Sequence, residues 1–224
     1  MIKDAPDFSV GILGLSPIAI NTIPILKNYP GGNVFYFDNF EGSNITWEIV
    51  KEQGASYCFA EIDKTQAYFG AGCARLYRNE NQTVSIRLGR HFQFRSTDMI
   101  GIEFSFMLSD KSGVSVVFMY EYIIDNKHYR FLISFEEPYI RVFTPGGYFT
   151  YYYGPNNSPW YMVWNNVKVI LNTKDHRYVR LYYSKKVYDI DYPSEIFSET
   201  GKASPRLRLG HYFSGGVMPK KVYG

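Results

Sequence analysis

Cysteine, histidine and net charge are all scarce in this chain, and each scarcity argues against a class of function. Among its 224 residues there are two cysteines and four histidines. The histidines are scattered rather than spaced as metal ligands, so we expect no zinc site. The formal net charge is only +3, and the longest basic runs are the pairs Lys185-Lys186 and Lys220-Lys221. Nucleic-acid-binding surfaces cluster their positive charge, so we expect no nucleic-acid partner.

Long apolar runs are also missing. The apolar stretch Val10–Leu26 is broken by Gly11, Gly14, Pro17 and Pro24, so it is too short to cross a membrane. Acidic residues follow Lys3 closely, which is unlike a signal peptide. The proline density of residues 1–32 resists both helix and central strand, and predicts an extended N-terminal arm. Such an arm either covers its own domain or packs on a neighbouring copy.

The two cysteines, Cys58 and Cys73, fall on segments that we expect to be neighbouring strands. A disulfide and a pair of small buried thiols both fit this placement. Motifs that would identify a reaction, such as the nucleophile elbow, the P-loop and the zinc-protease helix, do not occur in the sequence.

What the sequence does contain is strict alternation from Gly101 to Phe143. Strand side chains alternate between two faces, so this pattern predicts a meander of half-buried antiparallel strands. The apolar positions of the alternation are Ile102, Phe104, Phe106, Val116, Phe118, Tyr120, Tyr129, Phe131, Ile133, Phe135, Ile140 and Val142. Further short strands with turn signals between them favour an all-β sandwich over residues 33–224. We expect one helical turn, at residues 193–197.

A more specific pattern lies between Trp164 and Asp189. It reads Trp-Asn-Asn-Val-Lys-Val, a polar turn, Arg-Tyr-Val-Arg-Leu-Tyr, a short turn and Tyr-Asp. Together with Phe37–Gly42, Trp47 and Ala67–Leu76, it resembles the concanavalin A-like jelly rolls, the group of lectins, glucanases and laminin-G domains. The resemblance implies an antiparallel jelly-roll β-sandwich with one sheet often concave. It also implies glycan binding, glycoside hydrolysis, or a structural role in virions and surface proteins.

The resemblance has one departure. Jelly rolls of this group close with a last strand beside the first one, and residues 217–224 contain no such pattern. We therefore expect the N-terminal arm or another chain to fill that place.

The group often holds a structural calcium ion near the first strand. Asp38 and Glu41, with backbone carbonyls near Gly72, are the candidate ligands here, although calcium needs six to eight oxygens. A polar turn without an ion is the alternative.

Glucanases of the group carry three acids on one strand face, and retaining hydrolysis needs two carboxyl groups about 5 Å apart. In this chain Glu61-Ile-Asp63 lacks a third acid, and the stretch after Asp189-Ile-Asp191 is interrupted by Pro193. Glu136 and Glu137 are neighbours in sequence and so point to opposite strand faces. We therefore expect no catalytic activity, with a degenerate glycoside hydrolase as the third alternative.

Aromatic rings that could stack on sugars are concentrated in the stretch 144–160, which we expect to be a loop or hairpin. The candidate glycan-binding residues are Tyr148, Tyr151, Tyr153, Asn156 and Trp160. The same composition fits rings that pack on the sandwich or across a subunit contact.

Taken together, these patterns favour a non-catalytic recognition or assembly protein. The first expectation is a structural subunit of a virion or extracellular surface assembly that self-associates through its arm. The second is a carbohydrate-binding, lectin-like module. No cofactor is expected apart from the candidate calcium ion.

Overall fold

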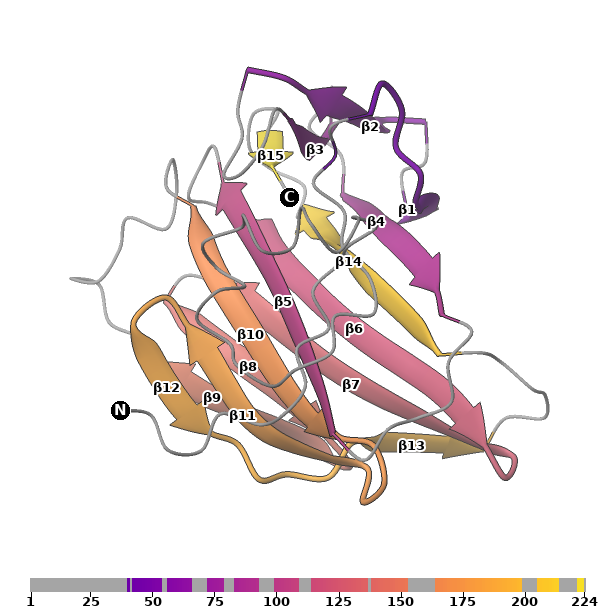
Figure 1. The fold of residues 1–224 in the computed structure, drawn as a ribbon, viewed down its shortest axis with the longest axis vertical. Helices are drawn as coiled ribbons and strands as arrows, with labels where there is room; N and C mark the ends of the chain where they lie inside the picture. The colour runs from indigo at the N-terminus through magenta and orange to yellow at the C-terminus, as the bar shows by residue number, and fades with distance from the viewer. Residues whose placement is uncertain are drawn as a thin grey trace, which may run out of the picture.

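The computed structural model describes two stacked antiparallel sheets and, within the described residues, no helix (Figure 1). The described residues are 40, 42–53, 56–65, 72–78, 83–92, 99–108, 114–136, 138–152, 164–198, 205–213 and 221–223. The arm predicted for residues 1–32 lies outside them, as does the stretch 33–41 apart from Phe40. No helix among the described residues is long and apolar enough to span a membrane.

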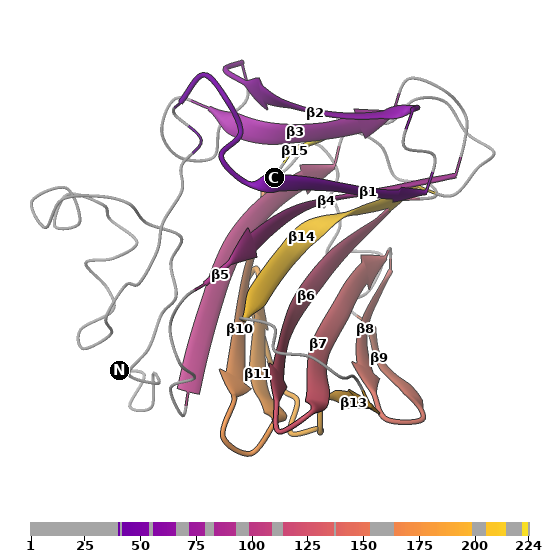
Figure 2. The same ribbon diagram turned by 90° about the vertical axis from the view of Figure 1, so that its right-hand side faces the viewer.

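The first sheet has eight strands and carries the central part of the sequence. Its order is β1 (Glu48–Gln53), β4 (Val84–His91), β14 (Arg206–Phe213), β6 (Val114–Ile124), β7 (Lys127–Glu136), β8 (Tyr139–Thr144) and β9 (Gly147–Tyr152), with β13 (Glu195–Ser198) also paired to β7. Figure 2 shows β4, β14 and β6 bending along their length.

The second sheet has seven strands and packs on one face of the first. Its order is β12 (Lys186–Asp189), β11 (Arg177–Tyr183), β10 (Asn165–Asn172), β5 (Met99–Leu108), β15 (Lys221–Tyr223), β3 (Cys73–Arg78) and β2 (Cys58–Asp63). The predicted all-β sandwich is confirmed.

Aromatic side chains fill the space between the sheets, as the alternation predicts. Phe106, Phe118, Phe131 and Phe135 are each at most 1% exposed. Phe104 of β5 stacks on Phe118 of β6, with ring centroids 5.8 Å apart, and so joins the two layers. Burial of such rings is the main source of stability in a sandwich of this kind.

Three expectations about single strands are wrong. β5 does not continue the meander into β6, because it pairs with β10 and β15 in the other sheet. Residues 195–198 form strand β13 rather than a helical turn, because β7 offers them an open edge. Residues 221–223, where no strand was expected, form β15 between β3 and β5. The expectation that the arm or another chain lies beside the first strand stays a prediction, because the arm is outside the described residues.

Strand β7 has a gap along one edge, and a tyrosine from the other sheet fills it. β13 pairs with β7 as far as Arg130, and β8 pairs with it from Ile133 onward. Between them, the N–H of Leu132 donates to the hydroxyl oxygen of Tyr178 at 2.6 Å, and that hydroxyl donates to the Leu132 carbonyl oxygen at 3.0 Å. One β11 side chain therefore satisfies both backbone groups that the missing strand would have paired.

Cys58 and Cys73 lie on adjacent strands as predicted, but both are free and buried. Cys58 pairs in register with Arg78, whereas Cys73 pairs with Asp63 at the other end of the ladder. Five residues of strand correspond to about 16 Å, and a disulfide needs Cα atoms within about 7 Å. Of the two alternatives, the buried thiols are confirmed.

Candidate functional site

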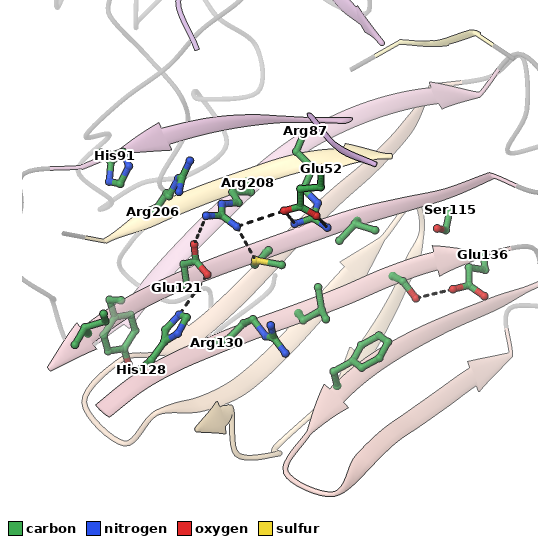
Figure 3. Close-up of a pocket in the computed structure, with 17 residues that line it drawn as sticks. Glu52, Arg87, His91, Ser115, Glu121, His128, Arg130, Glu136, Arg206 and Arg208 are labelled. Carbon is green, nitrogen blue, oxygen red and sulfur yellow. Dashed lines mark hydrogen bonds and ion pairs between the residues drawn. The ribbon is translucent and has the colours of Figure 1, made fainter. Parts of the chain in front are cut away.

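The outer face of the eight-stranded sheet is hollowed into a cleft of about 670 Å³. Because Ile86, Phe118 and Phe131 point into the core, the alternate residues of β4, β6 and β7 point outward. Figure 3 shows arginines, glutamates and histidines of β1, β4, β14, β6 and β7 directed toward this cleft. We call the outward side chains Arg87, Glu121, Arg130, Arg206 and Arg208 the arginine face.

Strand register sets three of these residues in one row across the sheet. Arg206 of β14 lies opposite Glu121 of β6, and Glu121 lies opposite Arg130 of β7. Glu121 nevertheless binds other partners: its Oε1 lies 3.1 Å from Arg208 Nη2 and its Oε2 lies 3.2 Å from His128 Nε2. The two arginines of the row therefore bind glutamates at its flanks.

Those flanking contacts are single hydrogen bonds. Arg206 Nη2 binds Glu48 of β1 in a short 2.6 Å contact, and Arg130 Nε binds Glu195 of β13 at 2.9 Å. The guanidinium carbon of Arg130 also lies 4.4 Å from the centre of the Phe197 ring, a cation–π contact.

Arg87 is held differently, by a bidentate pair. Its Nη2 and Nη1 lie 2.8 and 2.9 Å from the two carboxylate oxygens of Glu52. Burial lowers the pKa of the Arg87 guanidinium, and the Glu52 carboxylate opposes that shift. Arg208 shares the same carboxylate at 3.8 Å. At this corner of the cleft, Arg87 and Arg208 are therefore joined through the Glu52 carboxylate.

The floor of the cleft between the charged side chains is apolar. Met119 of β6 lies opposite Arg208 on one side and Leu132 of β7 on the other, and Val117 lies opposite Gly210. Gly210 has no side chain, so it adds nothing above the sheet at that point. Phe143 of β8 also lines the cleft. We call Val117, Met119, Leu132 and Phe143 the apolar lane, which runs from Arg208 toward β8.

Exposed aromatic rings continue the lane at the edge of the sheet. Tyr139, Tyr148 and Tyr152 are 39, 54 and 56% exposed. The rings of Phe143 and Tyr148 lie 5.5 Å apart, and those of Tyr139 and Tyr152 lie 5.8 Å apart. We call these three tyrosines and Phe143 the aromatic strip. Arg141 lies over the Tyr148 ring at 5.1 Å.

The structure separates the predicted glycan-binding residues. Tyr148 lies in the aromatic strip, whereas Tyr151 points to the other side of β9, where its ring contacts Tyr188 of β12 at 5.3 Å. Tyr153, Asn156 and Trp160 lie outside the described residues. Of the stretch 144–160, expected to be a loop or hairpin, residues 144–152 form the end of β8, a turn with Gly146 at φ 89° and strand β9, whereas residues 153–160 lie outside the described residues.

The calcium prediction concerns residues only partly described. Asp38 and Glu41 lie outside the described residues, while Gly72 is buried, and a Cβ built on it would lie 2.7 Å from the Phe40 carbonyl oxygen. Gly72 thus lies beside the backbone of Phe40. The described residues contain no group of three or more His, Cys, Asp or Glu side chains suited to a metal. The calcium site stays a prediction.

Of the acids considered as remnants of a catalytic site, those within the described residues contact cations, and Glu137 lies outside them. Glu61 and Asp63 of β2 share Arg75, at 2.9 and 3.7 Å. Asp189 and Asp191 bind Arg180 and Arg177 respectively. Unlike these four acids, Glu136 lines the cleft, and it binds Arg141 at 2.7 Å.

Sequence reasoning missed the arginine face. A search for runs of adjacent Lys and Arg fails here, because strand alternation separates residues of one face by two positions. The usable signal was arginine alternating with apolar residues, as in Arg206-Leu207-Arg208 and Ile86-Arg87-Leu88.

No protein-family model matches the chain, and a comparison with curated proteins finds no match. Solved structures do resemble it. An endo-beta-1,4-glucuronan lyase from the fungus Trichoderma reesei is similar with a TM-score of 0.56 at 10% identity, over 81% of this chain and 90% of that chain. Cellulose induced protein, Cip1, is similar with a TM-score of 0.56 at 13% identity, over 83% and 92%. A Bacillus licheniformis beta-glucanase is similar with a TM-score of 0.49 at 11% identity, over 83% and 92%.

The chain therefore has the concanavalin A-like jelly-roll fold, as its sequence predicted. At these identities the likeness establishes the fold alone.

Proposed function

We propose that this protein is a non-catalytic carbohydrate-binding module, and that the glycan lies along the apolar lane and the aromatic strip. The observation that carries the proposal is the 670 Å³ cleft opening beside three exposed tyrosines. Sugar rings have apolar faces that stack on aromatic side chains, while their hydroxyls need charged and polar partners such as those that line the lane. A fold neighbour whose name describes a polysaccharide lyase supports this choice of ligand class.

The arrangement of carboxylates supports binding without catalysis. Glycoside hydrolysis needs two carboxyl groups that act directly on the substrate. The described glutamates of this face, Glu48, Glu52, Glu121, Glu136 and Glu195, each contact an arginine within 4 Å. Arg208 also lies between Glu52 and Glu121 (Figure 3).

We therefore expect that a polysaccharide which binds is not cleaved. Incubation with the protein for a day should release neither new reducing ends nor unsaturated products.

The aromatic strip gives the direct test of binding. Removing a stacked ring costs about 1 kcal/mol, so Tyr148→Ala and Tyr152→Ala should each weaken glycan binding roughly fivefold. Affinity electrophoresis against a panel of soluble polysaccharides would measure this. Val187→Ala is the matched control, because Val187 is 55% exposed on β12 of the other sheet. Equal retardation of all three variants and the parent protein would contradict the assigned face.

The assembly role rests on the arm at residues 1–32, which lies outside the described residues, and it stays a prediction. If the arm joins copies, deleting residues 1–32 converts an oligomer into a monomer in multi-angle light scattering. A protein that has the same mass with and without the arm would contradict this role and leave the glycan-binding proposal intact.

A further inference from the structure

The arginine face has a surplus of hydrogen-bond donors, and we infer from it that the glycan is acidic, with sugar carboxylates that bind Arg206 and Arg130. This inference rests on the proposed function and specifies its ligand class. The cleft is lined by four arginines, two histidines and three glutamates, and two further glutamates, Glu48 and Glu195, bind Arg206 and Arg130 from its flanks.

Unused N–H groups are the first observation. A guanidinium carries five N–H donors. Among contacts within the described residues, Arg206 uses Nη2 and Arg130 uses Nε. The Nε atoms of both Arg206 and Arg208 are buried and have no acceptor. A ligand cannot reach these buried Nε atoms, but Nη1 of Arg206 and both Nη atoms of Arg130 make no hydrogen bond within the described residues and remain for a ligand that brings acceptors.

The carboxylates of the protein cannot supply those acceptors. Glu121, which lies between Arg206 and Arg130 in register, is already shared by Arg208 and His128. Glu52 is likewise shared by Arg87 and Arg208. A sugar hydroxyl both donates and accepts, whereas a carboxylate only accepts. The acidic sugar is therefore the better complement to a face whose own acceptors are fully used.

The spacing of the two arginines fits every second sugar of an extended chain. Arg206 and Arg130 are two strands apart, which corresponds to about 9.6 Å across the sheet. That distance is comparable with the length of a disaccharide. A chain that crosses the strands would rest its ring faces on Met119 and Leu132. Its carboxylates, which project from the ring edges, would reach Arg206 and Arg130 beside the apolar lane.

A carboxylate fits these arginines better than a sulfate ester does. Both anions accept hydrogen bonds from guanidinium, but a planar carboxylate matches the planar guanidinium fork with two parallel bonds. Arg130, which is bound through Nε alone within the described residues, has both Nη groups for such a pair. We therefore assign the anion to a uronic acid, and sulfated glycans become an arm of the test.

The test compares three ligands of matched length by titration calorimetry. They are a polyuronate oligosaccharide, the same oligosaccharide with its carboxyl groups reduced to hydroxymethyl groups, and a sulfated oligosaccharide. We expect the polyuronate to bind at least tenfold more tightly than its reduced form, and the difference to shrink as salt is added. Arg206→Gln and Arg130→Gln should each weaken polyuronate binding about tenfold and leave the reduced form unaffected.

Arg180→Gln is the matched control, because Arg180 pairs with Asp189 on the other sheet. Thermal melting of each variant separates loss of binding from loss of fold. Equal binding of the polyuronate and its reduced form would overturn the acidic ligand while the proposed carbohydrate site stands. Tighter binding of the sulfated ligand would overturn the carboxylate assignment, as would an equal loss in Arg180→Gln. Absence of binding by all three, and by a neutral glycan panel, would overturn the carbohydrate site itself.

Discussion

Tyr178→Phe is expected to lower the free energy of unfolding by about 2–3 kcal/mol, although it removes a single oxygen atom. That oxygen accepts from the Leu132 N–H and donates to the Leu132 carbonyl oxygen at the gap in β7. Tyr178 is fully buried, so its phenylalanine replacement leaves both backbone groups without a partner. Urea unfolding followed by tryptophan fluorescence measures the change.

The chain contains a matched control for this substitution. Tyr120 is also buried, 1% exposed, but its hydroxyl has no hydrogen-bond partner. Tyr120→Phe should therefore leave stability unchanged or raise it slightly, because it removes an unsatisfied polar atom from the core. If both variants unfold at the same urea concentration, the Tyr178 hydroxyl does not hold the gap. Leu132 also lies in the floor of the cleft, so Tyr178→Phe should weaken glycan binding as well.

Gly210→Ala is the second substitution with a large expected effect, about 1–3 kcal/mol of lost stability. A Cβ at this position would overlap the backbone carbonyl oxygen of Ile86 and lie 2.5 Å from the Arg87 Cα. Both atoms belong to the neighbouring strand β4, so β4 and β14 must move apart to admit the methyl group. That movement shifts Arg87 relative to Arg208, and glycan binding should fall together with stability.

Gly42→Ala serves as the control for Gly210→Ala. Its nearest neighbouring atom would be the Asn44 carbonyl oxygen at 3.6 Å, an ordinary contact, and the site is exposed. We expect a change within about 0.5 kcal/mol. Chemical unfolding of both variants checks the comparison. A Gly210→Ala protein as stable as the parent would show that the two central strands are not held as closely as described.

Period-two alternation was enough to predict the strands between Gly101 and Phe143 and the inward direction of residues such as Phe118 and Phe131. It could not assign strands to sheets, because β5 and β6 have the same pattern and differ only in their partners. It also failed for β13, where Pro193 and Ser194 resemble a helix start. The decisive factor there was the open edge of β7, which is a property of the assembled sheet.

The candidate site was less accessible to sequence reasoning than the fold. Arg87, Arg130 and Arg206 become neighbours only through the register of β4, β14, β6 and β7. In each strand separately, these arginines have the pattern of an ordinary solvated face. Tyr148 was predicted from composition, whereas its partners Tyr139 and Phe143 lie on the preceding strand and were assigned to the meander.

The position of β14 has a consequence for how the protein is made. β14 lies between β4 and β6, yet it leaves the ribosome after every other strand of its sheet. Until then, β4 and β6 each have an unpaired edge, and such edges promote aggregation during synthesis. The strand that brings Arg206 and Arg208 therefore also completes the sheet, so a nascent chain acquires its binding surface and its protection from aggregation in one late step.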